Sequence, residues 1–292
     1  MADPVTGDID LHVHTTASDG SISPADTVRA AAERGVTLLG ITDHDTTLGI
    51  AEAQETARET RVTVVPGVEL SCDLESVEVH VLGYFVQPGG EALETGLREL
   101  REHRDQRNEQ ILEKLAALGA PVSAQRVQEI AGSGSVGRPH IAFAMVEAGH
   151  VATITDAFHR YLARKKPAYV PRRLLTPARA SEIIHQAGGL SALAHPAKIK
   201  SNSVIADALA VGLDAVEVYH CDHNAHDVET LLALARSHNL LIVGGTDSHG
   251  PHSDRPIAIG SVTIPEWVGD ELLKRAPEWW REGRRGPVQA AR

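Results

Sequence analysis

The sequence predicts an α/β protein built around a mostly parallel β-sheet. Short hydrophobic runs with the two-residue period of strands alternate with segments whose hydrophobic residues recur at the helical period. This alternation occupies the first 86 residues and resumes near residue 176. Repeated strand–helix units form parallel sheets, which are either open and doubly wound or closed into a barrel. A chain of 292 residues with 42% hydrophobic content can bury a core of that size.

The two strand–helix blocks contain clear end signals for their elements. Ser23 and Pro24 are the N-cap and first residue expected of a helix, and Gly35 lies where a C-cap glycine belongs. In the first block, strands are expected at 7–14, 36–43, 62–70 and 77–86, and helices at 24–34 and 47–60. In the second block, strands are expected at 190–195, 215–219 and 240–246, and helices at 177–187, 203–211 and 225–238.

Between the two blocks the pattern becomes helical throughout. Helices are expected at 91–118, 123–131, 138–149 and 154–163. We therefore expect an all-helical insertion over residues 91–168, on one rim of the barrel or sheet, that caps a substrate site. The α/β part then consists of residues 1–90 and 169–292. Its C-terminal stretch, with Trp267, Trp279 and Trp280, is expected to pack on the barrel and to end in a frayed tail.

Composition excludes several classes of function. Lys and Arg number 28 against 39 Asp and Glu, a formal net charge of −11, which disfavours nonspecific binding to long duplex DNA or to an anionic membrane. Two cysteines, Cys72 and Cys221, cannot form a disulfide framework or a four-thiolate zinc site, so we expect a cytoplasmic protein that holds metals through nitrogen and oxygen. The N-terminal sequence lacks a signal-peptide pattern, and no apolar run reaches the roughly 18 residues of a membrane span.

The 16 histidines of the chain outnumber its Phe, Trp and Tyr residues together. His12 and His14 lie two residues apart at the end of the first predicted strand, so both side chains point to the same side. Alone, this pair is equally compatible with two solvent-facing histidines. Other His, Asp and Glu residues lie at or near strand ends, or inside the fourth strand: His44, Glu69, His80, His195, Asp247 and His249. Because carboxyl ends of parallel strands build the sites of such folds, this convergence predicts a multinuclear metal site rather than unrelated core histidines.

A series of motifs allows a more specific interpretation. DLHVHTTASDG, GITDHD, PGVELS, VHVLGY, GRPHIA, KKPAYV, LAHP and GTDSHG occur in this order between about residues 8 and 250. In combination they resemble the motif series of the PHP (polymerase and histidinol phosphatase) family, which belongs to the amidohydrolase superfamily. The resemblance implies a distorted (β/α)7 TIM-like barrel with two or three divalent metal ions per subunit, Mn above all, with Fe or Zn as alternatives.

The resemblance also implies roles for individual residues. Matched position by position, it implies nine metal ligands: His12, His14, Asp19, His44, Glu69, His80, His195, Asp247 and His249. Of these, Glu69, His195, Asp247 and His249 are implied in catalysis as well, with Glu69 as a bridge between ions. Asp19, His44 and His249 would form the outermost subsite, which holds either a third metal or the substrate phosphate directly. Both alternatives are open at this point.

The charge of this ligand set predicts an anionic substrate. Its three carboxylates carry three negative charges with the imidazoles neutral, so two divalent ions leave one net positive charge and three ions leave three. A phosphate monoester and a metal-bound hydroxide would supply the missing negative charge, with two ions roughly 3.5–4 Å apart. The expected mechanism is in-line attack of a metal-bridging hydroxide on phosphorus, without a covalent enzyme intermediate. The proton donor to the leaving group is open between a histidine and a metal-bound water near His195 or His220.

The helical insertion is expected to supply substrate contacts. Arg101, Arg104 and Asn108 fall on one face of the long helix, with Arg107 beside them. The alternative is a solvated face paired with the acidic residues of the same helix, and for any single arginine this is the simpler interpretation. Further phosphate contacts are expected from the Gly/Ser run that contains Ser135, from Arg138 after it, and from Lys166 in a lysine pair placed just before a strand.

A second group of potential ligands follows the sixth predicted strand. It consists of His220, Cys221, Asp222, His223 and His226. Because the ligand set implied by the resemblance is already complete, we interpret these residues as rim residues or substrate contacts rather than as a separate metal site.

The resemblance leaves several functions to choose from. We favour removal of the 3′-phosphate from nucleoside 3′,5′-bisphosphates, for example adenosine 3′,5′-bisphosphate to AMP and phosphate, because stand-alone chains of this length with such an insertion look like the nucleotide-acting branch. The alternatives are 5′–3′ trimming of short oligoribonucleotides and hydrolysis of histidinol phosphate, which would not need the arginine-bearing insertion. A non-catalytic metal-binding module is disfavoured because no ligand position is lost. The expected partner is therefore a nucleotide or short oligonucleotide, not long duplex nucleic acid or a membrane.

Overall fold

The computed structural model describes residues 7–75, 77–132, 136–171 and 174–284. The chain divides into two compact units. One unit is formed by Met1–Glu94 together with Leu175–Arg292, and the other by Thr95–Leu174.

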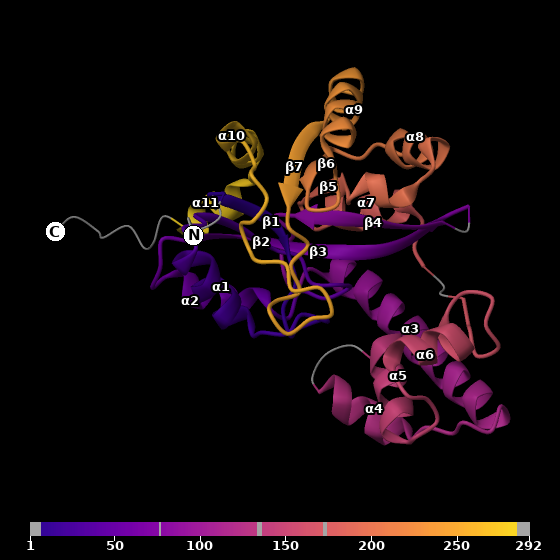
Figure 1. The fold of residues 1–292 in the computed structure, drawn as a ribbon. Helices are drawn as coiled ribbons and strands as arrows, with labels where there is room; N and C mark the ends of the chain where they lie inside the picture. Colours follow the sequence, from indigo (N-terminus) through magenta and orange to yellow (C-terminus); the bar gives the residue numbers. More distant parts are fainter. Residues whose placement is uncertain (1–6, 76, 133–135, 172–173, 285–292) are drawn as a thin grey trace. The chain divides into compact units, whose positions relative to one another are not determined.

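The first unit is a nearly closed seven-stranded barrel (Figure 1). Its strands are hydrogen-bonded in sequence order: β1 (Ile9–Val13), β2 (Leu38–Ile41), β3 (Thr63–Leu74), β4 (Val77–Tyr84), β5 (Leu190–Leu193), β6 (Ala215–His220) and β7 (Leu241–Gly245). Val13 forms a parallel bridge with Ser248, and the backbone N–H of His14 donates to Ser248 O at 2.9 Å. These bonds join the first strand to the segment that follows the last. The predicted distorted TIM-like barrel of seven strands is confirmed.

β4 departs from the mostly parallel sheet that the sequence predicts. β1, β2 and β3 are parallel to one another, as are β5, β6 and β7, but β4 is antiparallel to both β3 and β5. A parallel crossover needs a dozen or more residues. The predicted strands at 62–70 and 77–86 leave only six residues between them, too few for a crossover. β3 also runs past its predicted end to Leu74, because its ladder with β4 continues to the pair Leu74 and Val77.

Helices follow most strands of the barrel unit, and the first of them starts at its predicted N-cap, Ser23. Ser23 Oγ accepts a hydrogen bond from the Asp26 N–H at 3.0 Å. The helices are α1 (Pro24–Glu33), α2 (Ile50–Ala57), α7 (Pro177–Gln186), α8 (Asn202–Ala210), α9 (Ala225–Ser237), α10 (Glu266–Lys274) and α11 (Glu278–Arg284), with a short 3-10 turn η2 (Pro196–Ile199). The sequence did not predict α10 and α11, because the apolar periodicity of these short helices is weak evidence by itself.

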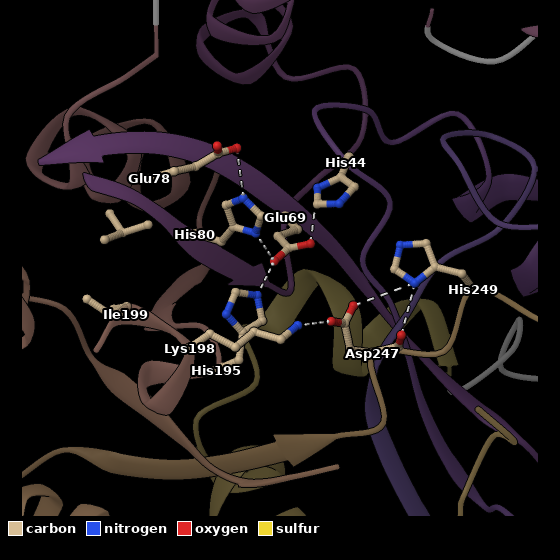
Figure 2. Close-up of a pocket in the computed structure, with 10 residues that line it drawn as sticks. His44, Glu69, Glu78, His80, His195, Lys198, Ile199, Asp247 and His249 are labelled. Carbon is tan, nitrogen blue, oxygen red and sulfur yellow. Dashed lines mark hydrogen bonds and ion pairs between the residues drawn. The ribbon is translucent and has the colours of Figure 1, made fainter. Parts of the chain in front are cut away.

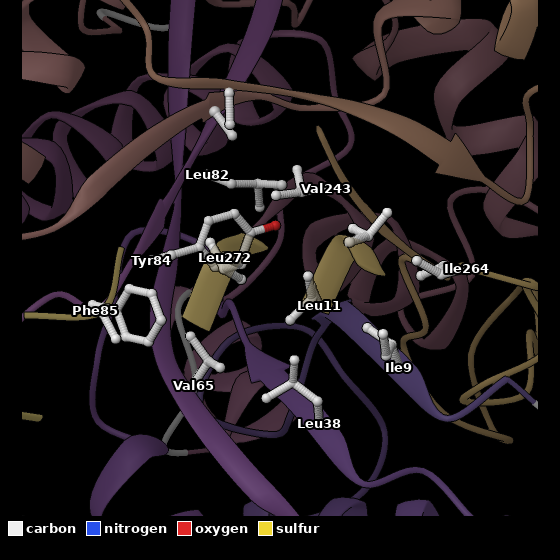
Figure 3. Close-up of a cluster of buried hydrophobic side chains, with 14 of the residues drawn as sticks. Ile9, Leu11, Leu38, Val65, Leu82, Tyr84, Phe85, Val243, Ile264 and Leu272 are labelled. Carbon is white, nitrogen blue, oxygen red and sulfur yellow. The ribbon is translucent and has the colours of Figure 1, made fainter. Parts of the chain in front are cut away.

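A single hydrophobic cluster joins the barrel interior to the C-terminal helices (Figure 3). Leu11, Leu82 and Tyr84 from the strands are fully buried in it. Trp280 packs edge-on against Phe85, with ring centroids 4.9 Å apart. The predicted packing of the C-terminal stretch on the barrel is therefore correct for Trp280 and for the partly buried Trp279. It is wrong for Trp267, which is 46% exposed.

The second unit is all-helical and has its own hydrophobic core. Its helices are α3 (Glu91–Ala117), which begins in the barrel unit, α4 (Ala124–Ala131), α5 (Arg138–Glu147) and α6 (Ile154–Ala157), followed by the π-helical turn η1 (Phe158–Leu162). The strand expected after Lys166 is not formed in residues 167–171 or 174–175, where Leu175 makes a single bridge with Cys72. None of the helices in the described ranges combines the length and hydropathy that a membrane span requires.

Candidate metal centre

Two buried histidines at the end of β1 belong to the site. His12 lies in β1, His14 follows it directly, and both side chains are fully buried. Their ring centroids are 5.2 Å apart, as the alternation of strand side chains requires of residues two apart. The barrel closure holds this segment, because the Asp247 N–H donates to His12 O at 2.8 Å.

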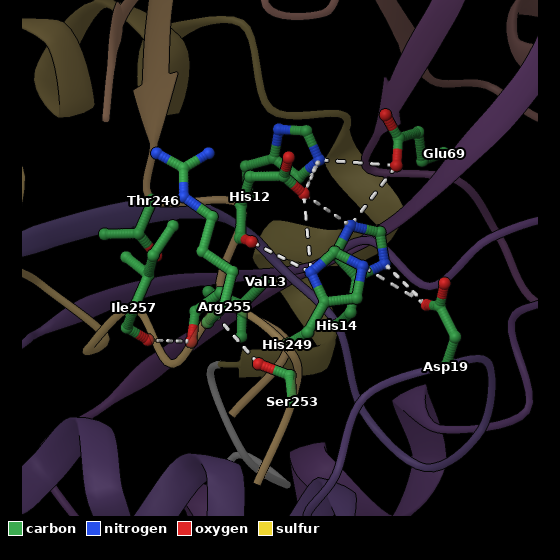
Figure 4. A network of polar contacts seen from close by, with 12 residues as sticks. His12, Val13, His14, Asp19, Glu69, Thr246, His249, Ser253, Arg255 and Ile257 are labelled. Carbon is green, nitrogen blue, oxygen red and sulfur yellow. Dashed lines mark hydrogen bonds and ion pairs between the residues drawn. The ribbon is translucent and has the colours of Figure 1, made fainter. Parts of the chain in front are cut away.

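Glu69 contacts most histidines of the cluster, and Figure 4 shows its contacts with His12 and His14. It occupies the middle of β3 rather than the predicted strand end, because pairing with β4 extends the strand beyond it. Five histidine nitrogens lie within 3.4 Å of its carboxylate: Nε2 of His12 and His14 and Nδ1 of His44 around Oε2, and Nδ1 of His80 and Nε2 of His195 around Oε1. A carboxylate with imidazoles around both oxygens has the arrangement of a bridging ligand.

Asp247 forms an inner group of potential ligands with His12, His14 and Glu69. Its backbone conformation is unusual. Its Oδ1 lies 3.4 Å from His12 Nε2 and 3.2 Å from His14 Nε2. Its φ is 55°, and His195 has φ 30°, both in the left-handed region that non-glycine residues seldom adopt. Such strain is found most often at functional sites, where the surroundings hold it in place.

A second, outer group of ligands surrounds Asp19. The Nε2 atom of His249 lies 3.4 Å from Asp19 Oδ1, and Nε2 of His44 lies 3.9 Å from Asp19 Oδ2. The His249 ring stacks on His14 at 4.2 Å between centroids, so the outer group adjoins the inner one. Asp19 has a side chain that is 46% exposed, which makes this the solvent-facing side of the cluster.

The donor atoms of this cluster suit divalent metal ions. Three sets of side chains each bring their ligand atoms within 4.8 Å of one another: His12, His14, Glu69 and Asp247; His44, Glu69 and His80; and His14, Asp19, His44 and His249. Among the described residues, several buried atoms here have no hydrogen-bond partner, including His12 Nε2, His14 Nε2, His44 Nδ1 and Glu69 Oε2. Buried polar atoms are normally satisfied. Convergent imidazole and carboxylate atoms left without partners fit a metal site.

The pKa values of the histidines in the cluster differ, because burial lowers them and the neighbouring carboxylates raise them. Burial is the largest effect, and it lowers the pKa of His44 and of His195 to about 4. At His14 the effect of burial is outweighed by Asp247 and Glu69, and the pKa rises to about 10. At His80 it is outweighed by Glu69 and Glu78, again with a pKa of about 10.

The pKa values of the two central carboxyl groups are lowered. Although burial opposes ionisation, the surrounding histidines hold the pKa values of Glu69 and Asp247 well below the usual range. Both groups are therefore carboxylates at neutral pH, which is the form that binds metal ions.

Glu217 is a buried carboxylate of the candidate site that the sequence analysis missed. It is fully buried in β6, with Oε1 3.0 Å from His12 Nδ1, and Oε2 accepts from the His195 N–H at 2.6 Å. A carboxylate on the remote nitrogen of a ligand histidine fixes the ring orientation and the tautomer. The charged residue inside the buried run VEVYH was a signal, because an unpaired carboxylate is rarely fully buried.

Two further buried carboxylates hold the loops that carry ligands. Asp10 accepts from the Thr246 N–H at 2.9 Å and from Thr246 Oγ1 at 2.7 Å, directly before Asp247. Asp43 accepts from the Thr15 N–H at 2.7 Å, directly after His14. Both residues stand inside recognised motifs but received no role from the sequence.

The inner group opens into a cavity of about 350 Å³ (Figure 2). His44, Glu69, His80, His195, Asp247 and His249 line it, together with Glu78, Val79, Lys198 and Ile199. The sequence analysis did not single out Lys198. Its Nζ lies 2.8 Å from Asp247 Oδ2.

The last residue of β6 and the residues after it lie near this cavity. His220 is buried with Nε2 3.6 Å from Asp247 Oδ2. His220, Cys221 and Asp222 bring ligand atoms close together. However, Asp222 forms a two-pronged ion pair with Arg255 and lies 3.5 Å from Lys198 Nζ, so its charge is already compensated by cations. This pairing favours rim residues over a separate metal site.

The helical unit uses several of the predicted substrate contacts for its own structure. Arg107 is buried and donates from Nε to Val170 O at 2.8 Å, and Asn108 Nδ2 donates to Val136 O at 3.0 Å. Arg138 lies over the rings of Phe158 and Tyr169, at 5.8 and 6.0 Å from their centroids. Arg101, Arg104 and Lys166 are partly exposed, and Ser135 lies outside the described residues. Substrate contact by these residues stays a prediction.

A seven-stranded barrel whose strand ends gather His, Asp and Glu around one cavity defines a metal-dependent hydrolase of the barrel type. Comparison with known proteins gives the family: the model of the PHP domain matches residues 10–117. The chain belongs to the PHP domain family and is a phosphoesterase.

Relatives and solved structures agree with this assignment. Over 249 residues the chain is 37% identical to the 5′-3′ exoribonuclease Rnm of Escherichia coli strain K12, covering 83% of this chain and 85% of that protein. It is 32% identical over 249 residues to the 3′,5′-nucleoside bisphosphate phosphatase of Chromobacterium violaceum, covering 83% and 87%. A crystal structure of a Bifidobacterium adolescentis protein assigned as a metal-dependent phosphoesterase superimposes with a TM-score of 0.82 and 31% identity, covering 94% and 98%.

Proposed function

We propose that the protein removes the 3′-phosphate of nucleoside 3′,5′-bisphosphates, converting adenosine 3′,5′-bisphosphate to AMP and phosphate. The observation that carries this proposal is the convergence of buried, unpartnered imidazole and carboxylate atoms on Glu69, at the wall of a cavity large enough for a phosphoryl group. The 32% identity to a bisphosphate phosphatase supports the choice of substrate.

The nine predicted ligands would hold two or three ions, with manganese as the proposed metal. His12, His14, Glu69 and Asp247 would bind one ion, and His80 and His195 would bind a second ion together with Glu69. In the outer group, Asp19, His44 and His249 would hold a third ion or the substrate phosphate. When bound, the ions would activate water for attack on phosphorus and stabilise the charge of the phosphoryl oxygens.

The residues of the chain orient this chemistry. Glu69 and Asp247 are ionised, and Glu217 holds the His12 ring with Nε2 directed at them. The outer group is the exposed side of the cluster, from which we expect the substrate to enter. In the reaction, water oxygen bonds to phosphorus, the bond from phosphorus to the 3′-oxygen breaks, and that oxygen takes up a proton.

A second candidate is 5′–3′ hydrolysis of short oligoribonucleotides, the alternative left open by the sequence. The observation in its favour is the higher identity, 37%, to a 5′-3′ exoribonuclease. If this exonuclease releases nucleoside 5′-monophosphates, both reactions break the bond between phosphorus and a 3′-oxygen, and they differ in whether a nucleotide chain follows that phosphorus. In either case, Arg101, Arg104 and Lys166 in the helical unit are proposed to select the substrate.

A phosphate-release and product screen tests these proposals. The manganese-loaded protein is incubated with nucleoside 3′,5′- and 2′,5′-bisphosphates, nucleoside monophosphates, histidinol phosphate and short 5′-phosphorylated RNA. We expect the highest kcat/KM for a 3′,5′-bisphosphate. Faster release of mononucleotides from RNA would establish the second candidate instead. Hydrolysis of histidinol phosphate but of no nucleotide would contradict both.

A further inference from the structure

We propose that Lys198 is a substrate-binding residue of this site, and that its ammonium group binds a nonbridging oxygen of the phosphoryl group that is transferred to water. The inference rests on the phosphoesterase function and not on the identity of the nucleotide. It assigns a role to a residue outside the nine predicted ligands.

The backbone around Lys198 directs its side chain over the metal cavity. Lys198 lies in the 3-10 turn η2, three residues after His195, and its N–H donates to His195 O at 3.0 Å. This hydrogen bond closes a single 3-10 turn whose N-cap is His195. The left-handed conformations of His195 and of Lys200, with φ 30° and 53°, bracket the turn. A ligand and a cation are therefore presented to the same cavity by one short segment (Figure 2).

The two oxygens of Asp247 have different neighbours. Oδ1 faces His12 and His14, at 3.4 and 3.2 Å, on the side of the proposed ligands. Oδ2 faces Lys198, at 2.8 Å, on the side of the cavity. Lys198 is thus adjacent to the ligand group without taking the place of a ligand. This is the position from which a cation can contact a phosphoryl group held at the same cluster.

The ammonium group of Lys198 has two carboxylate neighbours, Asp247 and Asp222, and the charge of Asp222 is compensated by another cation. Its second carboxylate neighbour, Asp222, lies at 3.5 Å and is itself bound by both terminal nitrogens of Arg255. Arg255 therefore compensates the charge of Asp222, so Asp222 does not need Lys198 as its counter-ion. An ammonium group has three protons, and Lys198 donates one of them to Asp247 Oδ2 at 2.8 Å.

The surroundings of Lys198 favour an anionic ligand. Among the described residues that line the cavity, Lys198 is the one with an ammonium or guanidinium group. Its side chain is 38% exposed, so an incoming phosphate can reach it without rearrangement of the barrel. A lysine that served only as a counter-ion to Asp247 would not need this access to the cavity.

The test measures phosphate binding separately from catalysis. Inorganic phosphate is titrated by calorimetry into the manganese-loaded protein, its Lys198→Met and Lys198→Arg variants, and the control Lys200→Met, an exposed lysine two residues away. Metal content is measured for every sample. A charge-assisted hydrogen bond to phosphate contributes enough that its loss should weaken binding by about tenfold to a hundredfold in Lys198→Met. Lys198→Arg should recover most of the affinity, and Lys200→Met should match the wild type.

Two results would overturn the inference. One is an unchanged phosphate affinity in Lys198→Met with full metal content. The other is loss of metal from Lys198→Met, which would show that the lysine acts through Asp247. If instead the wild-type protein binds phosphate but cleaves no 3′,5′-bisphosphate, the proposed substrate is wrong while the role of Lys198 is still decided by the titration.

Discussion

The barrel unit and the helical unit both bury polar side chains, but they use them differently. In the barrel, His12, His14 and Glu69 are fully buried and converge on one another with several atoms left unpartnered among the described residues. In the helical unit, the buried Arg107 and Asn108 donate to backbone carbonyls of their own unit, although Asn108 Oδ1 also has no hydrogen-bond partner among the described residues. In the barrel, the buried polar groups that converge on one another form the candidate site, whereas the buried polar groups of the helical unit named here support its own structure.

The largest effect on the barrel cluster is expected from neutralising Glu69, the carboxylate at its centre. Glu69→Gln removes the carboxylate that five histidine nitrogens share while keeping its volume. We expect loss of bound metal and a fall in kcat/KM of at least about a thousandfold, because the nucleophile and the charge stabilisation depend on the ions. Metal analysis and phosphate release measure the two effects.

Glu78→Gln is the matched control for Glu69→Gln. Glu78 lines the same cavity from β4, but its side chain is 46% exposed and 3.6 Å from His80 Nε2. This variant should keep its metal and most of its activity. Full metal content and turnover in Glu69→Gln would show that the cluster in the barrel is not the site.

Metal binding at the barrel cluster is expected to depend on pH. Without a bound ion, the pKa values of His14 and His80 are raised from about 6.5 to about 10. Their protonated forms therefore stabilise the fold most below pH 6.5, and this contribution is lost as the pH rises through 10. Metal binding must displace these protons, so affinity should fall about tenfold per proton for each pH unit between 9 and 7. Titrations in buffers of different ionisation enthalpy count the protons released; release of none at pH 7 would contradict the raised pKa values.

Glu217 offers a smaller perturbation of the barrel cluster. Glu217→Gln keeps a hydrogen-bond acceptor near His12 Nδ1 but removes the charge. Loss of such an outer partner typically weakens metal affinity by about tenfold to a hundredfold. We expect the variant to regain near-normal kcat at saturating metal, and Glu229→Gln, on the exposed face of α9, to be unaffected. A lasting loss of kcat at saturating metal would instead give Glu217 a role beyond positioning.

The same contrast explains how much the sequence could predict. His12, His14 and Asp247 were identifiable because strand alternation and barrel topology bring strand ends together wherever the helices lie. Glu217 and Lys198 were not identifiable. The role of Glu217 depends on a partner 205 residues away, and that of Lys198 on the left-handed backbone of His195 and the 3-10 turn that follows it. The direction of β4 was predictable from the short link before it, but the pattern of hydrophobic residues alone does not distinguish parallel from antiparallel pairing.

On α3 the sequence could not separate structure from function. Arg101, Arg104, Arg107 and Asn108 are all hydrogen-bond donors at neighbouring positions, and periodicity shows only that they share a region of the helix surface. Which of them is buried depends on how α4, α5 and the segment near Val170 pack against α3. That packing is decided by residues far along the chain.

A pair of matched variants on α3 is expected to have the smallest effects. Arg107→Met leaves Val170 O without its donor inside the unit, which should lower the stability of the helical unit by about 1–3 kcal/mol. Arg104→Met, three residues earlier and partly exposed, should leave stability unchanged and raise KM for the bisphosphate by about tenfold. Hydrogen exchange of α3 and α5 and steady-state kinetics measure the two outcomes, and neither variant should lose metal. An increase in KM for Arg107→Met at unchanged stability would show that buried polar groups in the helical unit also serve the substrate, and the distinction between the two units would fail.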